Sequence, residues 1–457
     1  MKEYSGEMIN FSDLGFIFRF LPVFLIAFYL TPATYRSVTL LIGSLAFYAV
    51  GDLKGFAVLG TAIVVNYLFG KAIGSEKRKY LLAFIVCIDA LMLVEFKLLS
   101  QFVYNSFMPI GISFFTFKMI SYQADLYMGK IDEEPGFIET AAYFCMFPQV
   151  VSGPIMRFSD YQKKTYFQTK EAIFSAIEDG LRFFTLGLGM KVLLADHLAM
   201  LWNDIGTIGY ESISTPLAWI GAACYSLELY FDFWGYSLMA AGIGVMLGFP
   251  FVVNFDQPYS AKNVSEFYRR WHASLGSWFR DYIYIPLGGS RVSEGRIFLN
   301  LLVVWLITGF WHGVTLNFIL WGLIIFVIIA FERFVIPGKI PVALGKIIGR
   351  VNVLILIPLT WVIFAISDFR GLLDYFKRLF PFFGKGIAVN SSDYIKNLGI
   401  YGGFLAVALI LLLPGLYRFF ERNRKHPVFT VLLFILFWIC VYSLSNAAGN
   451  PFMYFRF

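Results

Sequence analysis

A histidine lies within a long uncharged stretch of the sequence. Residues 297 to 331 contain no Asp, Glu, Lys or Arg, and His312 is the only group there that titrates near neutral pH. An ionisable side chain at membrane depth has to face the protein interior or water, which makes it a candidate functional group. Imidazole can accept the proton of a sugar hydroxyl as that oxygen attacks an acyl carbonyl. His312 is therefore a candidate general base, and a hydrogen-bonded structural histidine is the alternative.

A second histidine, His272, lies in a polar interruption of the sequence, residues 254 to 296. Plotted at 100° per residue, its apolar and aromatic residues share one side: Phe267, Trp271, Leu275, Trp278 and Tyr282. Arg269 and Arg280 fall on the opposite side, and His272 falls on the border. This pattern predicts one amphipathic helix in an interfacial or re-entrant segment, or lining a wet cavity. An anchoring helix whose histidine only forms a hydrogen bond is the alternative.

The remaining residue types offer no competing catalytic group. The sequence has no G-x-S-x-G turn, no P-loop and no cysteine paired with a histidine. Its four cysteines lie in apolar sequence and are interpreted as small core residues. His272 and His312 have no third histidine near them, so no metal site is predicted. Direct transfer of an acyl group with one base fits this set of residues.

The elements that must hold these side chains are membrane helices. Of the 457 residues 58% are hydrophobic and 15% charged, and the mean hydropathy is +0.69. Soluble domains carry ~25% charged residues, so a soluble globular protein is excluded. Aromatic residues make up 19%, which excludes intrinsic disorder. We expect a single membrane-embedded domain over residues 1–457.

Apolar runs long enough to enter or cross ~30 Å of hydrocarbon recur along the whole sequence. They lie near residues 14–30, 37–53, 55–70, 80–98, 137–151, 172–200, 216–248, 297–312, 315–336, 352–367, 398–417 and 427–445. The sequence thus predicts an all-α polytopic membrane protein with roughly 10–12 transmembrane or re-entrant helices. One uninterrupted helix over residues 297 to 331 would exceed the hydrocarbon thickness, so a break is predicted at Gly313 to Asn317.

The net charge of +7 lies mostly in short connectors, which suits a membrane protein better than a nucleic-acid-binding one. If the N-terminus is outside, the first three spans place a basic connector inside: Lys71, Lys77, Arg78 and Lys79 against Glu76. A second basic connector, residues 418 to 425, precedes the last run. Both termini are therefore expected to be extracytoplasmic.

Six segments of the sequence resemble one family. They are Gly111 to Tyr127, Phe147 to Arg157, Tyr230 to Phe249, Asn263 to Arg291 (NVSEFYRRWHASLGSWFRDYIYIPLGGSR), Thr308 to Gly322 (TGFWHGVTLNFILWG) and Asn450 to Phe457. Together they resemble the membrane-bound O-acyltransferase superfamily, and within it the bacterial alginate O-acetylase branch. The likeness runs from about Phe11 to the last residue. Lys118 departs from the family pattern, in which a neutral polar residue such as Gln is expected.

The resemblance implies a multi-pass enzyme of the bacterial plasma membrane whose helices surround a central tunnel. It implies that His312 is the catalytic base and that His272 is a second important histidine. The donor would be a cytoplasmic thioester, commonly acetyl-CoA, with no metal. The acceptor would be an extracytoplasmic polysaccharide, reached through a partner protein.

Further residues near the two histidines are candidates for binding or orienting the substrates. Arg269, Arg270 and Arg280 are candidates to bind the phosphates of CoA, with lipid headgroups as the alternative ligand. Asp232, Asn254 and Asp256 are candidate orienting groups, with ordinary caps or turns as the alternative. Trp311, next to His312, is a candidate substrate-contacting residue.

Three other functions are open from the sequence. A sister branch of the family transfers D-alanine from a carrier-protein thioester to teichoic acids, although the segment Tyr284 to Arg291 favours the acetyl branch. A transporter or flippase, with His312 as a relay or gate, is another class. A catalytically silent scaffold is the third.

Overall fold

The computed structural model describes residues 10–76, 78–103, 106–131, 135–151, 153–383 and 390–446. Both chain termini and the segment Asn450 to Phe457 lie outside the described residues, as do Lys77 and Ser152. Every regular element in the described residues is a helix, so the prediction of an all-α protein is confirmed.

Contacts divide the chain into two compact units. The first contains the described residues of 10–188, 236–253 and 433–446, and the second contains 189–235 and 254–432. The prediction of one domain over residues 1–457 stays a prediction, and so does the central tunnel.

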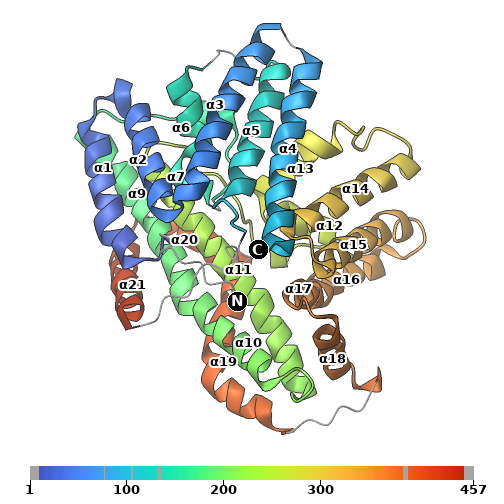
Figure 1. Cartoon of the computed structure of the whole chain (residues 1–457). Coiled ribbons are helices and arrows are strands. Elements are labelled where there is room, and N and C mark those ends of the chain that lie inside the picture. The colour runs from blue at the N-terminus through green and yellow to red at the C-terminus, as the bar shows by residue number, and fades with distance from the viewer. Residues whose placement is uncertain are drawn as a thin grey trace. The chain divides into compact units, whose positions relative to one another are not determined.

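Helices form over each of the predicted apolar runs, and further helices form between those runs (Figure 1). The first half contains α1 Leu21–Leu30, α2 Arg36–Gly51, α3 Leu53–Glu76, α4 Lys79–Phe102, α5 Ile112–Tyr127, α6 Phe137–Cys145, α7 Phe147–Val150, α8 Phe158–Gln162, α9 Lys170–Gly189, α10 Asp196–Ile208 and α11 Thr215–Met246. The second half contains α12 Val264–Arg270, α13 Ala273–Phe279, α14 Glu294–His312, α15 Leu316–Ala330, α16 Val342–Val351, α17 Ile357–Ala365, α18 Phe369–Leu379, α19 Asp393–Leu411, α20 Pro414–Asn423 and α21 Pro427–Asn446.

Eight helical stretches of the described residues are long and apolar enough to cross a membrane. They are Ala33–Gly51, Leu53–Ile73, Lys170–Ile208, Glu294–His312, Leu316–Val335, Val342–Ala365, Asp393–Leu411 and Pro427–Asn446. The other predicted runs are helical too, at Phe16–Leu30, α4, α6 with α7, and α11. The chain is thus a polytopic membrane protein.

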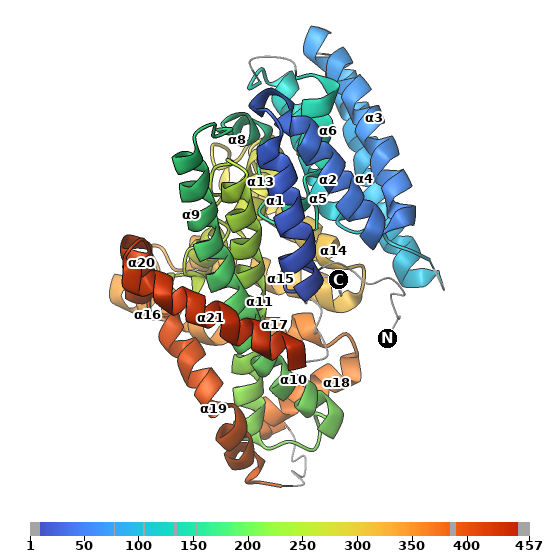
Figure 2. The same ribbon diagram turned by 90° about the vertical axis from the view of Figure 1, so that its left-hand side faces the viewer.

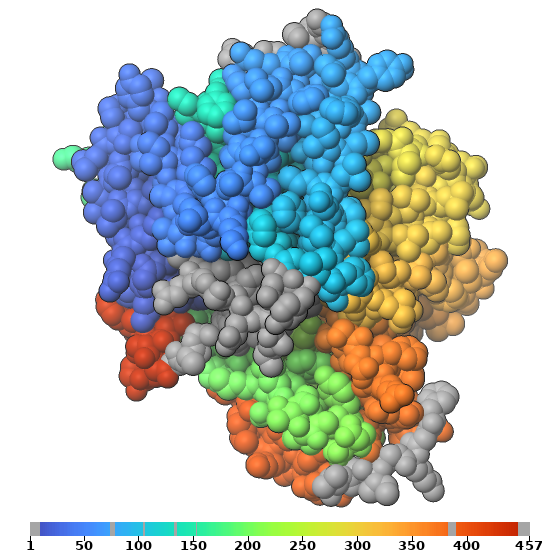
Figure 3. All heavy atoms as spheres, viewed as in Figure 1, coloured from blue at the N-terminus to red at the C-terminus, as the bar shows by residue number. Residues whose placement is uncertain are grey.

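In the first unit, α3, α4 and α5 pack side by side, and their side chains fill the space between the ribbons (Figures 1 and 3). Helices α1 and α2 form a second packed group (Figure 2). A buried polar chain joins the first group: Gln123 on α5 donates to Asn66 on α3 at 3.0 Å, and Asn66 donates to Asp89 on α4 at 2.9 Å. The same α5 buries Lys118, whose Nζ donates to the Tyr143 carbonyl at 3.0 Å.

In the second unit, α14 and α15 form a closely packed hairpin. The predicted break is confirmed, because α14 ends at His312 and α15 begins at Leu316. Glycines allow the two backbones to meet: a Cβ on Gly322 would lie 2.5 Å from the Trp305 carbonyl oxygen, and one on Gly309 2.6 Å from the Phe318 carbonyl oxygen. Close approach of this kind needs small residues at the helix interface.

Candidate active site

His312 is the last residue of α14 and lies inside the second unit, with 7% of its surface exposed. Aromatic rings surround the imidazole, with centroids 4.5 Å away for Trp311, 5.0 Å for Phe364 and 5.2 Å for Trp321. After His312 the backbone becomes extended at Gly313. A polar, ionisable ring is thus buried at a helix end and does not face lipid.

Hydrogen bonds beyond the helix end fix the start of α15. The Asn317 side chain accepts from Thr315 at 2.6 Å and donates to the Phe364 carbonyl at 2.9 Å. This second bond ties α15 to the last turn of α17. The rings of Trp321 on α15 and Phe364 on α17 are thereby held in contact, with centroids 5.3 Å apart. The glycine contacts between α14 and α15 hold His312 itself.

The prediction of a single amphipathic helix around His272 is wrong. Helix α12 ends at Arg270, α13 begins at Ala273, and His272 between them adopts a left-handed backbone with φ of 47°. The reason is a competing set of hydrogen bonds, because the Ala273 N–H donates to the Asn254 carbonyl at 2.8 Å. The predicted faces survive the break: Phe267, Trp271, Leu275 and Trp278 are buried, and Arg269 and Arg280 are exposed.

His272 is buried and faces groups of its own unit. Its Nδ1 lies 3.0 Å from Oδ1 of Asn254, and its ring contacts Phe233 edge-on at 4.6 Å. Burial lowers the pKa of His272, which lies outside the candidate spans, to about 3. The charged form is disfavoured because the site is poorly solvated, so the imidazole is neutral near pH 7. Backbone strain in a non-glycine residue is a feature of functional sites.

Trp311 lies next to both histidines. Its ring centroid is 6.3 Å from that of His272 and 4.5 Å from that of His312. The structure therefore brings together four of the predicted site residues: His272, His312, Trp311 and Asn254.

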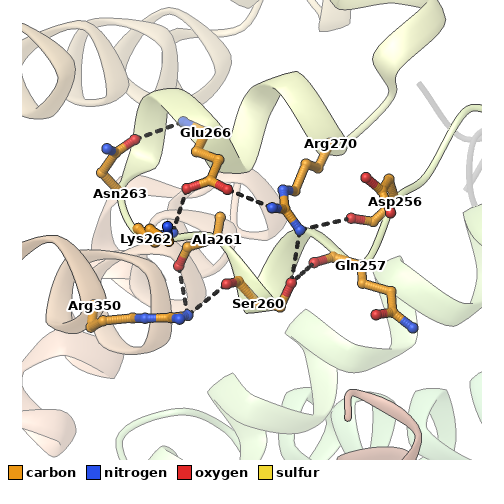
Figure 4. A network of polar contacts seen from close by, with 9 residues as sticks. All are labelled: Asp256, Gln257, Ser260, Ala261, Lys262, Asn263, Glu266, Arg270 and Arg350. Carbon is orange, nitrogen blue, oxygen red and sulfur yellow. Dashed lines mark hydrogen bonds and ion pairs between the residues drawn. The ribbon is translucent and has the colours of Figure 1, made fainter. Parts of the chain in front are cut away.

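Arg270 belongs to a local ion-pair network (Figure 4). Its guanidinium donates to Glu266 and to Ser260, and Arg350 donates to the carbonyls of Ser260 and Ala261. These bonds fasten α12 to the segment before it, and that segment to α16. Arg270 therefore makes its contacts within the protein, to Glu266 and Ser260.

The other two arginines and the acidic candidates have separate surroundings. Arg280 pairs with Asp281 at 2.8 Å, and both Arg269 and Asp256 are exposed. Asp232 on α11 is buried and pairs with Lys191 at 2.9 Å. Its chain neighbour Phe233 packs edge-on against the ring of His272.

Two residues of this region escaped the sequence interpretation. Lys191, in the π-helical turn Met190–Ala195, bonds Asp232 and also Asp196 at 2.6 Å. A lysine inside an apolar run indicates a buried carboxylate partner, so the position of Lys191 within the run 172–200 could have predicted this ion pair. Trp321 gave no signal, because an aromatic residue in an apolar run is ordinary. Among the described residues, no group of three or more His, Cys, Asp or Glu side chains could hold a metal ion.

Comparison with known proteins gives a consistent result. A family model described as MBOAT, membrane-bound O-acyltransferase family, matches residues 97–367. The probable alginate O-acetylase AlgI of Pseudomonas aeruginosa is 35% identical over 437 residues, covering 90% of this chain and 82% of the relative. The peptidoglycan O-acetyltransferase of Helicobacter pylori is 28% identical and covers 98% of each chain.

A relative with another activity matches less of the chain. The teichoic acid D-alanyltransferase of Bacillus subtilis is 27% identical over 223 residues, which cover 47% of this chain and 56% of the relative. The family match covers both histidines and more than half of the chain. The chain therefore belongs to the membrane-bound O-acyltransferase family, in the branch that resembles the alginate O-acetylases, and it is a multi-pass membrane O-acyltransferase.

Proposed function

We propose that this enzyme moves an acetyl group from a cytoplasmic thioester, acetyl-CoA, to hydroxyl groups of an extracytoplasmic polysaccharide in a bacterial plasma membrane. The observation that carries the proposal is the pair of buried histidines whose rings both lie near the ring of Trp311. The relatives named as O-acetylases match most of the chain, and those named as D-alanyltransferases match less than half. This difference favours acetyl transfer over D-alanyl transfer.

His312 acts as the general base in this proposal. The acceptor oxygen attacks the thioester carbonyl carbon while His312 takes the hydroxyl proton. The carbon–sulfur bond then breaks, and the proton passes from His312 to the thiolate sulfur. The products are an acetyl ester and a free thiol, and no net proton is released. His312 has to be neutral at the start, because only a neutral imidazole nitrogen can accept the proton.

His272 supports the reaction as a hydrogen-bonding group. Asn254 holds its Nδ1, which directs Nε2 away from that bond. A neutral ring in this tautomer accepts a hydrogen bond at Nε2. We assign it the task of orienting a hydroxyl or amide group of a substrate.

The substrates reach the site from opposite sides of the membrane in this proposal. A tunnel past Trp311 would let polar groups meet without entering lipid. Arg269 and Arg280, which are exposed, are the proposed contacts for the donor's phosphates. The polysaccharide would be reached through a partner protein outside the cytoplasm, and both termini would lie on that side.

The donor is tested with purified protein in liposomes. Acetyl-labelled acetyl-CoA is supplied on one side and an acceptor oligosaccharide on the other, and labelled ester is measured. Labelled ester from acetyl-CoA is the expected result. Ester formed only from a D-alanyl carrier-protein thioester would contradict the acetyl assignment. Movement of an intact solute with no new covalent bond would instead indicate a transporter.

A further inference from the structure

The indole N–H of Trp321 is a buried hydrogen-bond donor whose role the fold does not explain. Trp321 lies on α15 and is 1% exposed, and its Nε1 is buried without a hydrogen-bond partner in the part of the chain that the structure describes. A buried donor left unpaired destabilises the folded protein, because it has lost its hydrogen bonds to water. Such a group in a folded protein calls for an explanation, and a catalytic role is one of the few available.

The indole is held firmly and lies beside His312. The two ring centroids are 5.2 Å apart with the ring planes at 87°. Trp361 stacks on the indole at 5.5 Å, and Phe364 meets it edge-on at 5.3 Å. The next residue, Gly322, lies against the backbone of α14, which restricts rotation of α15 at this position.

We propose that the Nε1–H of Trp321 donates a hydrogen bond to the carbonyl oxygen of the bound thioester. When the acceptor oxygen adds to the carbonyl carbon, that oxygen becomes an oxyanion and the hydrogen bond strengthens. When the carbon–sulfur bond breaks, the carbonyl reforms and the sulfur receives the proton from His312. The inference rests on the proposed function, because it needs acyl transfer at His312.

The chemistry of indole suits this role. Its N–H only donates, so it cannot compete with His312 for the hydroxyl proton. A donor that is already fixed in a poorly solvated site needs no reorganisation as charge develops, and this gives most of the benefit of such a group. Among the described residues no acceptor takes this N–H, so it is available to an oxygen of the substrate.

The test removes the N–H while keeping the ring. Trp321 is replaced site-specifically by benzothienylalanine, in which sulfur stands where indole has N–H. We expect kcat to fall roughly 10²–10³-fold, with the Kd for a non-reactive acyl-CoA analogue changed less than about threefold. The same replacement at Trp305, on α14, is the matched control and should leave kcat unchanged. An unchanged kcat for the Trp321 isostere would overturn the inference.

Two substitutions by standard amino acids distinguish loss of the N–H from a folding defect. Trp321→His keeps a ring N–H and should retain more activity than Trp321→Phe, which has none. Equal kcat values for these two variants would also overturn the inference. His312→Ala is assayed in parallel. If it still transfers acetyl, the proposed function fails. If it is inactive while the isostere is fully active, only the role of Trp321 fails.

Discussion

Nδ1 of His272 and Oδ1 of Asn254 lie 3.0 Å apart, although 18 positions separate the two residues in the sequence. The Ser274 backbone N–H and hydroxyl also donate to that oxygen, at 3.4 and 2.8 Å. A backbone N–H can only donate, so the oxygen of the Asn254 amide must face this cluster. Nδ1 of His272 therefore carries the hydrogen, and Nε2 is the acceptor.

Replacing Asn254 should release this tautomer. We expect Asn254→Ala to lower kcat by roughly 10–100-fold, because the imidazole loses the acceptor that orients it. Asn254→Asp keeps an acceptor oxygen and should retain more activity. Ser274→Ala removes one donor to the same oxygen and is the control, with less than about a threefold effect. Equal activities of the Ala and Asp variants would contradict the orienting role. The measurement is the initial rate of acetyl transfer.

Gly322→Ala should separate α14 from α15. Its Cβ would lie 2.5 Å from the Trp305 carbonyl oxygen, and backbone atoms cannot turn aside as a side chain can. Overpacking of this kind costs typically 1–3 kcal/mol. We expect a lower apparent Tm and reduced activity, because His312 and Trp321 lie on the two separated helices. Gly295→Ala, at the start of α14 with nothing within 4 Å, is the control and should be tolerated. A Gly322→Ala protein with normal Tm and activity would show that the contact is not required.

The buried His272 should make the protein sensitive to acid. Its pKa is lowered to about 3 by burial, against 6.5 for an ordinary histidine. The unfolded chain therefore binds the proton more tightly than the folded protein. The contribution of the neutral His272 ring to the free energy of unfolding is fully present above about pH 6.5. It is lost as the pH falls toward 3.

Thermal unfolding in detergent at pH 7.5 and pH 5 measures this effect. We expect the apparent Tm to be lower at pH 5 than at pH 7.5. The difference should be smaller in His272→Gln, because the glutamine side chain cannot be protonated. The same pH difference in both proteins would show that other groups cause the acid sensitivity.

The exposed arginines can be separated from the structural one by the choice of donor. Arg269→Gln and Arg280→Gln together should raise KM for acetyl-CoA several-fold, because charge-assisted contacts to phosphate are lost. KM for S-acetylpantetheine, which lacks those phosphates, should not change. Arg270→Gln should instead lower the apparent Tm, because it breaks the bonds to Glu266 and Ser260. An equal change in KM for both donors would exclude phosphate binding by Arg269 and Arg280.

The sequence predicted what depends on hydrophobic patterning. The apolar runs became helices, and the break after His312 follows from the length of an uncharged run. Helix α5 was not among the predicted runs because Lys118, Gln123 and Asp125 interrupt its apolar pattern, yet the protein buries all three. The break at His272 could not be predicted, because it depends on hydrogen bonds to Asn254, which is distant in sequence. The pairing of Lys191 with Asp232 depends in the same way on the packing of two helices.

The role of His312 is tested most directly by the rate of acetyl transfer in a His312→Ala protein. The variant is purified, its apparent Tm is matched to that of the unmodified protein, and single-turnover transfer from acetyl-CoA is measured. We expect a rate lower by roughly two to four decades with donor binding retained, because a general base has been removed. A folded His312→Ala protein that transfers acetyl at a near-normal rate would contradict it.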